Sequence, residues 1–188
     1  MKDYILHRNF LDDNICKLLA QWILKNKNTN IFDNANMNGN RMTTRYSTNF
    51  SFPVTASRVQ SHVIGFLGLS EYIIAPFNQG MIADIALPGD TCYMHTDRVW
   101  KEGFITMHCN IYLSNFTGGE AIVENTVIKL SRGDMLVYPV SIVNHGSLKV
   151  QPPDARLLWT FGFCISDSEY QRIFSILPQC RATNSPIQ

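Results

Sequence analysis

The sequence predicts a mainly β fold with flanking helices: a double-stranded β-helix (jelly roll) with N-terminal helices packed on one sheet. Three observations support this. In the first third of the chain, apolar residues recur at a period near 3.6, which is typical of amphipathic helices. From about residue 80 the period changes to two, in short segments separated by turns that contain Gly. So many short strands at close spacing are typical of a barrel or jelly roll.

Two helices are expected before residue 75. The first follows Asp12 and Asp13, either of which is a fair N-cap, and its apolar face comprises Ile15, Leu18, Leu19, Trp22 and Ile23. The second is closed by Gly68, and its apolar face comprises Val59, Val63, Phe66 and Leu67. Residues 27–50, rich in Asn and Thr, are interpreted as a long loop between them.

The strands are expected in the segments MIADIAL, ITMHCNIYL, AIVEN, TVIKL, DMLVYPV and RLLWTFGFCI. After them, Ser166 and Glu169 fit the S-x-x-E capping box of a last helix. We therefore expect one domain over residues 1–188. It has a helical part over about 1–75, a jelly-roll core over about 80–165 and a C-terminal helix over about 166–177.

Composition excludes several classes of function. The 188 residues carry a formal net charge of +1 and no run of basic residues, so we expect no nucleic-acid partner. No apolar run approaches the length of a bilayer span, so we expect no membrane partner. The five cysteines lie far apart without a C-x-x-C pair, which predicts reduced thiols and a cytoplasmic protein. The sequence does not reveal the oligomeric state.

His95 and Asp97 suggest a metal site. Residues i and i+2 of a strand point the same way, so this H-x-D offers an imidazole and a carboxylate from one extended segment. A non-haem iron site needs a second imidazole. The other histidines are His7, His62, His108 and His145. We favour His145, since it follows a strand in the second half of the β region and Gly146 leaves backbone room beside it.

Alternation along two strands suggests which side chains line a pocket. In TMHCNIYLS the polar face carries Thr106, His108, Asn110 and Tyr112, while Met107, Cys109, Ile111 and Leu113 face the core. In the last strand Arg156, Leu158 and Thr160 share one face, opposite Leu157, Trp159 and Phe161. Tyr93 shares the parity of His95.

The order of these elements resembles the Fe(II)/2-oxoglutarate-dependent oxygenases, in particular the prolyl-4-hydroxylase-like branch. The resemblance covers about residues 80–165. It consists of His95-Thr96-Asp97, IYLSNFTGGEAIV, LSRGDMLVYPVSIVNHG and PPDARLLWTF. Two positions depart from the family pattern: an aliphatic residue near Ile85 replaces a tyrosine, and Ser114 replaces an asparagine.

The resemblance implies roles for these residues. His95, Asp97 and His145 would be the catalytic iron ligands. Arg156 would pair with the distal carboxylate of 2-oxoglutarate, because a buried dicarboxylate needs a charged, two-pronged partner. The other candidates for the co-substrate pocket are Tyr112, Tyr93, Asn110 and Thr160. Candidate substrate contacts are Arg98, Trp100, His108 and, if the Asn-rich loop folds over the site, Arg45.

The resemblance also implies an activity. Fe(II), 2-oxoglutarate and O2 would oxidise an amino acid, a peptidyl residue or a related small metabolite, most simply by hydroxylation, with release of succinate and CO2. Ascorbate would serve as reductant. Asp97 argues against a halogenase, which has Gly or Ala there. Two alternatives are a non-catalytic jelly roll that binds a metabolite or partner, and a cupin-like metalloenzyme that does not use 2-oxoglutarate.

Overall fold

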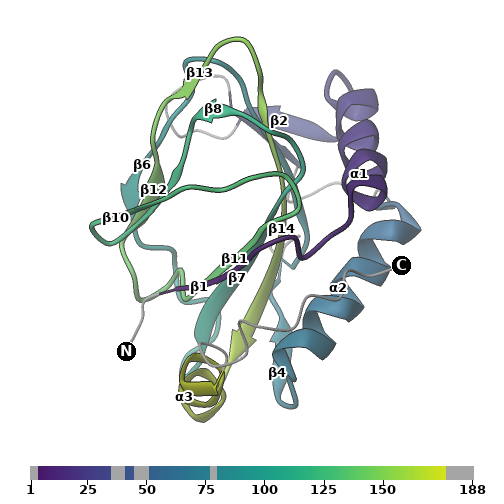
Figure 1. Cartoon of the computed structure of the whole chain (residues 1–188). Coiled ribbons are helices and arrows are strands. Elements are labelled where there is room, and N and C mark those ends of the chain that lie inside the picture. Colours follow the sequence, from purple (N-terminus) through teal and green to yellow (C-terminus); the bar gives the residue numbers. More distant parts are fainter. Residues whose placement is uncertain (1–3, 35–40, 45–50, 77–79, 177–188) are drawn as a thin grey trace.

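The computed structural model of the chain describes residues 4–34, 41–44, 51–76 and 80–176. Figure 1 shows the order of its elements along the chain. They are β1 (Ile5–His7), α1 (Asp13–Asn26), β2 (Phe32–Asn34), β3 (Met42–Thr44), α2 (Val54–Leu67), β4 (Tyr72–Ile74), β5 (Ile82–Ala86), β6 (Cys92–His95), β7 (Ile105–Tyr112), β8 (Thr117–Gly118), β9 (Ala121–Val123), β10 (Thr126–Ile128), β11 (Met135–Tyr138), β12 (His145–Ser147), β13 (Val150–Gln151), β14 (Arg156–Ile165) and α3 (Asp167–Ile176).

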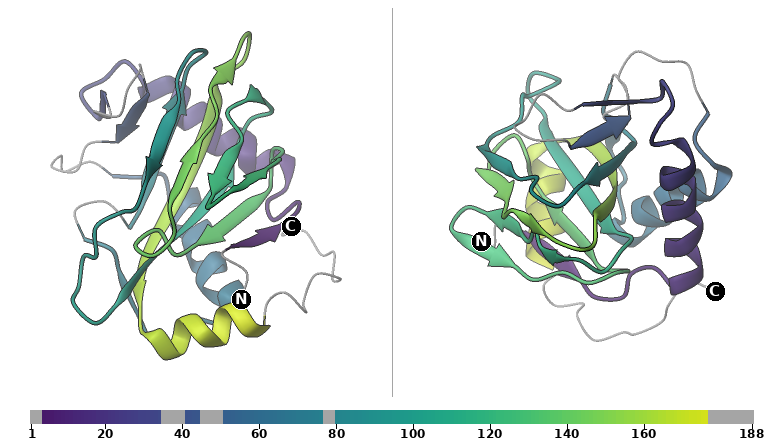
Figure 2. Two further views of the ribbon diagram at one scale, coloured as in Figure 1. Left: turned by 90° about the vertical axis from the view of Figure 1, so that its left-hand side faces the viewer. Right: turned by 90° about the horizontal axis from the view of Figure 1, so that it is seen from above.

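Two antiparallel sheets form the roll. The major sheet has eight strands in the order β1-β11-β7-β14-β5-β3-β2, with β4 paired to β14. The minor sheet has the order β10-β9-β12-β6, and β8 pairs with β13 at one end. In Figures 1 and 2 the minor sheet faces one side of the major sheet, while α1 and α2 cover the other side. The predicted jelly roll with helices on one sheet is confirmed.

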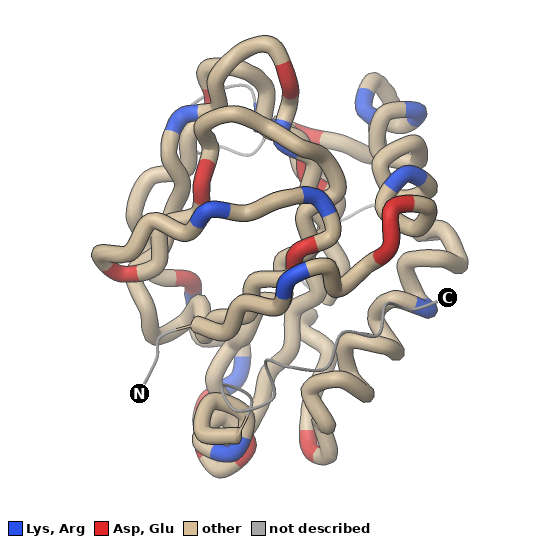
Figure 3. Tube along the Cα trace, in the orientation of Figure 1, with Lys and Arg blue, Asp and Glu red and all other residues tan. Residues whose placement is uncertain are grey.

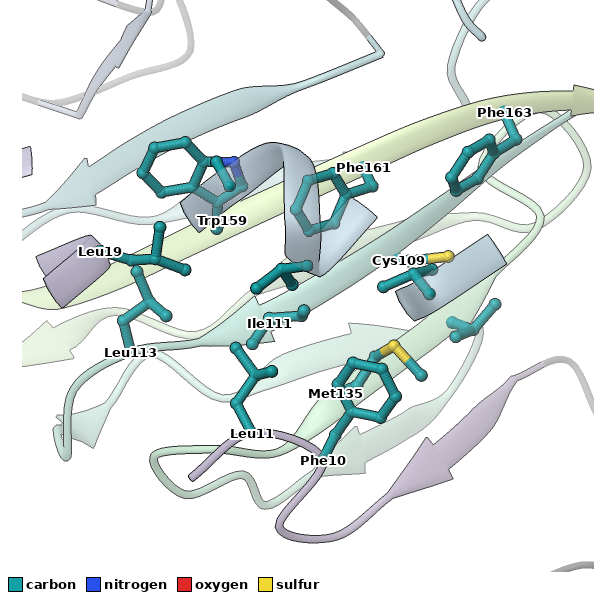
Figure 4. Close-up of a cluster of buried hydrophobic side chains, with 14 of the residues drawn as sticks. Phe10, Leu11, Leu19, Cys109, Ile111, Leu113, Met135, Trp159, Phe161 and Phe163 are labelled. Atoms are coloured by element: carbon teal, nitrogen blue, oxygen red, sulfur yellow. The ribbon is translucent and has the colours of Figure 1, made fainter. Parts of the chain in front are cut away.

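The main core lies between the helices and the major sheet. Met107, Cys109 and Ile111 of β7 and the odd-numbered residues 157–165 of β14 pack there against the apolar faces of α1 and α2. Figure 4 shows part of this cluster, with Trp159 of β14 near Leu19 of α1 and Phe161 farther along β14. A smaller cluster, which includes Leu136 and Leu158, lies inside the roll. The alternation predicted for β7 and β14 is therefore confirmed.

The ends of α1 and α2 follow the expected chemistry. The Asp12 carboxylate accepts a hydrogen bond from the Ile15 backbone N–H at 2.9 Å, as an N-cap does. At the other helix, Gly68 adopts φ = 60° and its N–H donates to the Gly65 carbonyl, so a glycine in the left-handed region ends α2.

The N-terminal part contains more strand than the sequence suggested. β1, β2, β3 and β4 all lie within residues 1–75, where helices and a long loop were expected. The stretch 27–50 was interpreted as a loop, but Phe32–Asn34 and Met42–Thr44 form an antiparallel pair that extends the major sheet beside β5. Each strand is three residues long, too short to show a period.

No helix in the described part of the chain is long and apolar enough to cross a membrane. Figure 3 shows Lys and Arg interspersed with Asp and Glu along the trace.

Candidate active site

A cavity of about 600 Å³ lies inside the roll. Its walls come from both sheets: from β7 and β14 of the major sheet, from β6 and β12 of the minor sheet, and from the β2–β3 pair. Of the predicted site residues, the cavity is lined by His95, Asp97, Arg98, Trp100, His108, Asn110, Tyr112, His145, Arg156 and Thr160. Long-range strand pairing thus brings together residues that are up to 65 positions apart, from His95 to Thr160.

His95, Asp97 and His145 form a cluster that could hold a metal ion. Strands β6 and β12 pair so that His95 lies directly opposite His145, with ring centroids 4.3 Å apart. Asp97 Oδ1 is 3.2 Å from His95 Nε2 and 3.9 Å from His145 Nε2. One ligand atom from each side chain lies within 4.8 Å of the other two. Two imidazoles and one carboxylate are the donor set of a non-haem Fe(II) site with open positions.

Backbone carbonyls orient both imidazole rings. His95 Nδ1 is 2.7 Å from the Tyr93 carbonyl oxygen, and His145 Nδ1 is 3.2 Å from the Val143 carbonyl oxygen. A carbonyl can only accept, so each Nδ1 carries a hydrogen and each ring turns its Nε2 toward Asp97, where the deprotonated Nε2 would offer its lone pair to a metal. Histidine ligands of metals are usually held in this way. The three residues therefore fit a ferrous ion.

Charges within the cluster are tightly coupled. The hydrogen bond to Asp97, assisted by Cys92, raises the pKa of His95 to about 10. Burial opposes ionisation of Asp97, but the hydrogen bond from His95 and the electrostatic interactions with His108 and His145 lower its pKa overall. Burial lowers the pKa of His145. An ionised carboxylate between imidazoles is the electrostatic arrangement that a cation would complete.

Gly146 allows β6 and β12 to approach each other. A Cβ built there would lie 2.7 Å from the Cys92 carbonyl oxygen and 3.0 Å from the Tyr93 carbonyl carbon. Both are backbone atoms, so any larger residue would push apart the strands that carry His95 and His145.

The polar face of β7 forms a hydrogen-bonded wall with β14 and β11. Thr160 Oγ1 donates to Asn110 Oδ1 at 2.8 Å, and Asn110 Nδ2 donates to Tyr138 Oη at 2.8 Å. Burial raises the pKa of Tyr112 to about 12, so its phenol stays neutral and can donate a hydrogen bond. Tyr138 was not singled out in the sequence, although it lies in the strand opposite β7, with Tyr138 paired to His108.

Arg156 is a buried guanidinium without a carboxylate partner among the described residues. It is 4% exposed, and Nη1 donates to the Gly119 carbonyl oxygen at 2.6 Å. Its Nε is buried and has no partner within the described chain. Burying a cation without a counter-charge is costly, so this arrangement suits an anionic ligand.

His108 also lines the cavity. Its Nδ1 is 3.9 Å from Asp97 Oδ2, and its buried Nε2 has no partner among the described residues. Burial lowers the pKa of His108 to about 4, so the ring is neutral.

Tyr93 does not line the cavity, and a β-bulge explains why. His95 pairs with His145, but Ser147, two residues on, pairs with Cys92, three residues back. The extra residue in β6 reverses the alternation, so Cys92 lines the cavity beside His95, while Tyr93 is 60% exposed and does not line it. Cys92 Sγ lies 3.9 Å from His95 Nδ1.

A second arginine in the cavity wall was missed. Arg41 Nε donates to Asp84 at 2.5 Å, and Nη1 donates to Cys92 Sγ at 3.5 Å. Arg41 belongs to the Asn-rich stretch in which Arg45 was the candidate, and Arg45 lies outside the described residues. A signal in the sequence was Asp84, a carboxylate within the otherwise apolar strand segment MIADIAL, because a buried carboxylate needs a cationic partner.

At the mouth, Arg98 and Trp100 follow the H-x-D segment and both line the cavity. The Arg98 guanidinium carbon is 5.8 Å from the centroid of the Trp100 ring.

No family model and no curated protein matches the chain by sequence. Solved structures do match it. A viral collagen prolyl hydroxylase from Paramecium bursaria Chlorella virus-1, in complex with 2-oxoglutarate, has a TM-score of 0.65 and 17% identity, over 88% of this chain and 97% of that chain. The fold is that of these oxygenases.

Two further structures share the fold. A prolyl hydroxylase from Trichoplax adhaerens, in complex with a peptide of the hypoxia inducible factor oxygen degradation domain, has a TM-score of 0.66 and 15% identity, over 90% of this chain and 86% of that chain. HygX from Streptomyces hygroscopicus, with nickel, 2-oxoglutarate and hygromycin B bound, has a TM-score of 0.62 and 9% identity, over 88% of this chain and 84% of that chain.

Proposed function

We propose that this protein is an Fe(II)- and 2-oxoglutarate-dependent oxygenase that hydroxylates an amino acid, a peptidyl residue or a related small metabolite. In the overall reaction, O2 and 2-oxoglutarate yield succinate and CO2, and a C–H bond of the substrate becomes C–OH. One atom of O2 enters succinate and the other enters the product. Ascorbate would keep the metal reduced.

The observation that carries the proposal is the pairing of two features in one cavity. The first is the cluster of His95, Asp97 and His145, and the second is the buried guanidinium of Arg156, which has no carboxylate partner among the described residues. A metal site alone would serve many reactions, and a buried arginine alone would bind many anions. Together they suit a co-substrate that has a metal-chelating keto-acid at one end and a carboxylate at the other. The fold of the matched structures supports the same reading.

Each group in the wall has a task in this scheme. His95, Asp97 and His145 would hold Fe(II), which when bound supplies the activation of O2. Arg156 would bind the distal carboxylate of the co-substrate, and the neutral phenol of Tyr112 can donate a hydrogen bond to that carboxylate. Asn110 and Thr160 bond to each other and fix the shape of the wall between them.

The remaining space would hold the substrate. A volume of about 600 Å³ lies within the range of about 300–1,000 Å³ typical of small-molecule pockets, and a five-carbon co-substrate fills only part of it. Arg98, Trp100 and His108 line the cavity without a role in holding the metal or the co-substrate. We infer a reducing, cytoplasmic setting, which is supported by four free, buried thiols in the described part of the chain.

The test is succinate formation from 2-oxoglutarate with Fe(II), ascorbate and O2, without an added substrate. The wild type should form succinate slowly, whereas His95→Ala and Arg156→Ala should not at the same 2-oxoglutarate concentration. Arg132→Ala is the matched control, since Arg132 pairs with Asp13 and does not line the cavity.

Two results would favour the alternatives. A wild type that neither binds Fe(II) nor forms succinate would indicate a binding protein without catalysis. A metal-dependent activity that survives in Arg156→Ala but is lost in His145→Ala would indicate a cupin-like enzyme that does not use 2-oxoglutarate.

A further inference from the structure

We propose that the substrate is a small carboxylic acid, that Arg98 binds its carboxylate at the mouth of the cavity, and that His108 contacts a second polar group deeper inside. This inference rests on the proposed function and names the substrate class of the same site.

The charges on the cavity wall point to Arg98. The Arg41 guanidinium is already neutralised by Asp84 at 2.5 Å. In the loaded site, Arg156 would meet one carboxylate of the co-substrate, while Asp97 and the other carboxylate would balance a divalent metal. Asp33 lines the cavity too, but it has an interaction of its own. Among the residues that the structure describes, Arg98 then has no counter-ion, so the complete site favours a substrate with one negative charge.

The geometry of Arg98 suits a carboxylate. The side chain is exposed, and no carboxylate in the described residues forms an ion pair with it. Its guanidinium lies over the Trp100 ring, 5.8 Å from the centroid. A guanidinium held on an aromatic ring keeps its in-plane N–H groups available, and these match the two oxygens of a carboxylate.

His108 gives an independent reason to expect a polar ligand. The residue is only 7% exposed, it lines the cavity, and its Nε2 has no partner among the described residues. A buried polar atom without a hydrogen bond is costly, and a hydroxyl, amine or amide of the substrate would supply one. His108 lies beside Asp97, so this contact would place the substrate next to the metal.

The position of Arg98 limits the size of the substrate. Arg98 directly follows the metal ligand Asp97, and consecutive Cα atoms are about 3.8 Å apart. A carboxylate bound by Arg98 therefore lies no farther from the metal than the extended side chains of Asp97 and Arg98 and this one step allow. A peptide has a main-chain carboxylate only at its C-terminus, so the site favours a free acid, such as an amino acid, over an internal peptide residue.

The test uses matched pairs of probes. Free 2-amino acids, 2-hydroxy acids and simple aliphatic acids are each compared with the corresponding primary amide. The initial rate of succinate formation with Fe(II), 2-oxoglutarate, ascorbate and O2 is measured with and without each probe. At least one acid should stimulate the rate while its amide does not.

The variants then locate the contact. Arg98→Ala should raise the KM for the stimulating acid by about 10- to 100-fold, because a charge-assisted hydrogen bond is lost. Arg98→Lys should raise the KM less than Arg98→Ala does, because lysine keeps the positive charge but not the two-pronged geometry of the guanidinium. His108→Ala should raise the KM as well. Lys101→Ala is the control, because Lys101 is a cation of the same loop. Its ammonium group lies over the Phe104 ring and does not line the cavity, so the KM for the acid should stay the same.

Three outcomes would overturn the inference: amides that stimulate as well as acids, an unchanged KM in Arg98→Ala, or no stimulation by any acid. In each case, substrate-independent succinate formation by the wild type, absent in His95→Ala, would leave the proposed function standing. A wild type that forms no succinate at all would refute the proposed function and, with it, the assignment of Arg98.

Discussion

At the scale of single residues, Gly146 sets how close the two metal-binding strands lie. Gly146→Ala places a methyl group 2.7 Å from the Cys92 carbonyl oxygen, so β6 must shift and carry His95 away from His145. We expect the affinity for Fe(II) to fall about 10- to 100-fold, the range for lost support of metal ligands. Anaerobic calorimetric titration with Fe(II) measures this.

The matched control is Gly65→Ala on α2, where a Cβ would have no atom within 4 Å. Metal affinity should be unchanged in this variant. Equal affinities in Gly146→Ala and the wild type would show that the separation of β6 and β12 does not control the site.

Side-chain alternation made much of the site predictable. The polar face of β7 and the even-numbered face of β14 line the cavity as expected, because unbroken strands keep a period of two. The same rule failed at Tyr93, since a bulge adds one residue to β6 and nothing in the sequence marks it. Cys92 and Arg41 were missed because their place in the wall depends on pairing with strands far away in the sequence.

At the scale of elements, Glu169 connects α3 to the end of α2. The capping box is only half formed: the Glu169 N–H donates to Ser166 Oγ at 3.2 Å, but the Glu169 carboxylate turns to Arg172 and to the Ser70 N–H. Arg172 in turn donates to the Gly68 carbonyl oxygen at 2.8 Å. One carboxylate therefore helps to hold two helices that the sequence shows only as separate segments.

This contact predicts a pH dependence of stability. The hydrogen bond from Arg172 and those from Ser70 lower the pKa of Glu169 below its ordinary value of 4.5. A group with a lowered folded pKa contributes stability above the unfolded pKa and loses it as the pH falls through the folded pKa. Glu169→Gln should therefore cost about 2 kcal/mol in the free energy of unfolding at neutral pH, and less at a pH well below 4.5.

Urea denaturation of the wild type and the variant at both pH values checks this. Glu71→Gln, a neighbouring exposed glutamate, should cost little at either pH. A deficit for Glu169→Gln that is independent of pH would show that shape rather than charge matters at this position.

The three-residue strands β2 and β3 could not be predicted from the sequence, unlike the longer elements. α1, α2 and the long strands β7 and β14 have enough residues to reveal a period. β2 and β3 have three residues each, and what holds them is their pairing with each other and with β5. Such strands depend on tertiary contacts that a local pattern does not contain.

At the scale of the whole molecule, bound ligands should raise the melting temperature. A ligand at about 100 times its Kd adds about 2.7 kcal/mol, which corresponds to roughly 5–10 °C for a protein of this size. Ni(II) should stabilise the wild type, and 2-oxoglutarate should stabilise it further. Differential scanning fluorimetry measures both shifts.

Two variants separate these contributions. Arg156→Ala should keep the shift produced by Ni(II) and lose the additional shift produced by 2-oxoglutarate, whereas His145→Ala should lose both. A full shift with 2-oxoglutarate in Arg156→Ala would place the co-substrate elsewhere.

The two halves of the proposed site belong to different sheets. The histidines lie on β6 and β12 of the minor sheet, and Arg156 lies on β14 of the major sheet. A bound 2-oxoglutarate would thus act as a non-covalent cross-link between the layers. We therefore expect hydrogen–deuterium exchange at the backbone amides of β6 and β12 to become slower when both the metal and 2-oxoglutarate are bound than when the metal is bound alone.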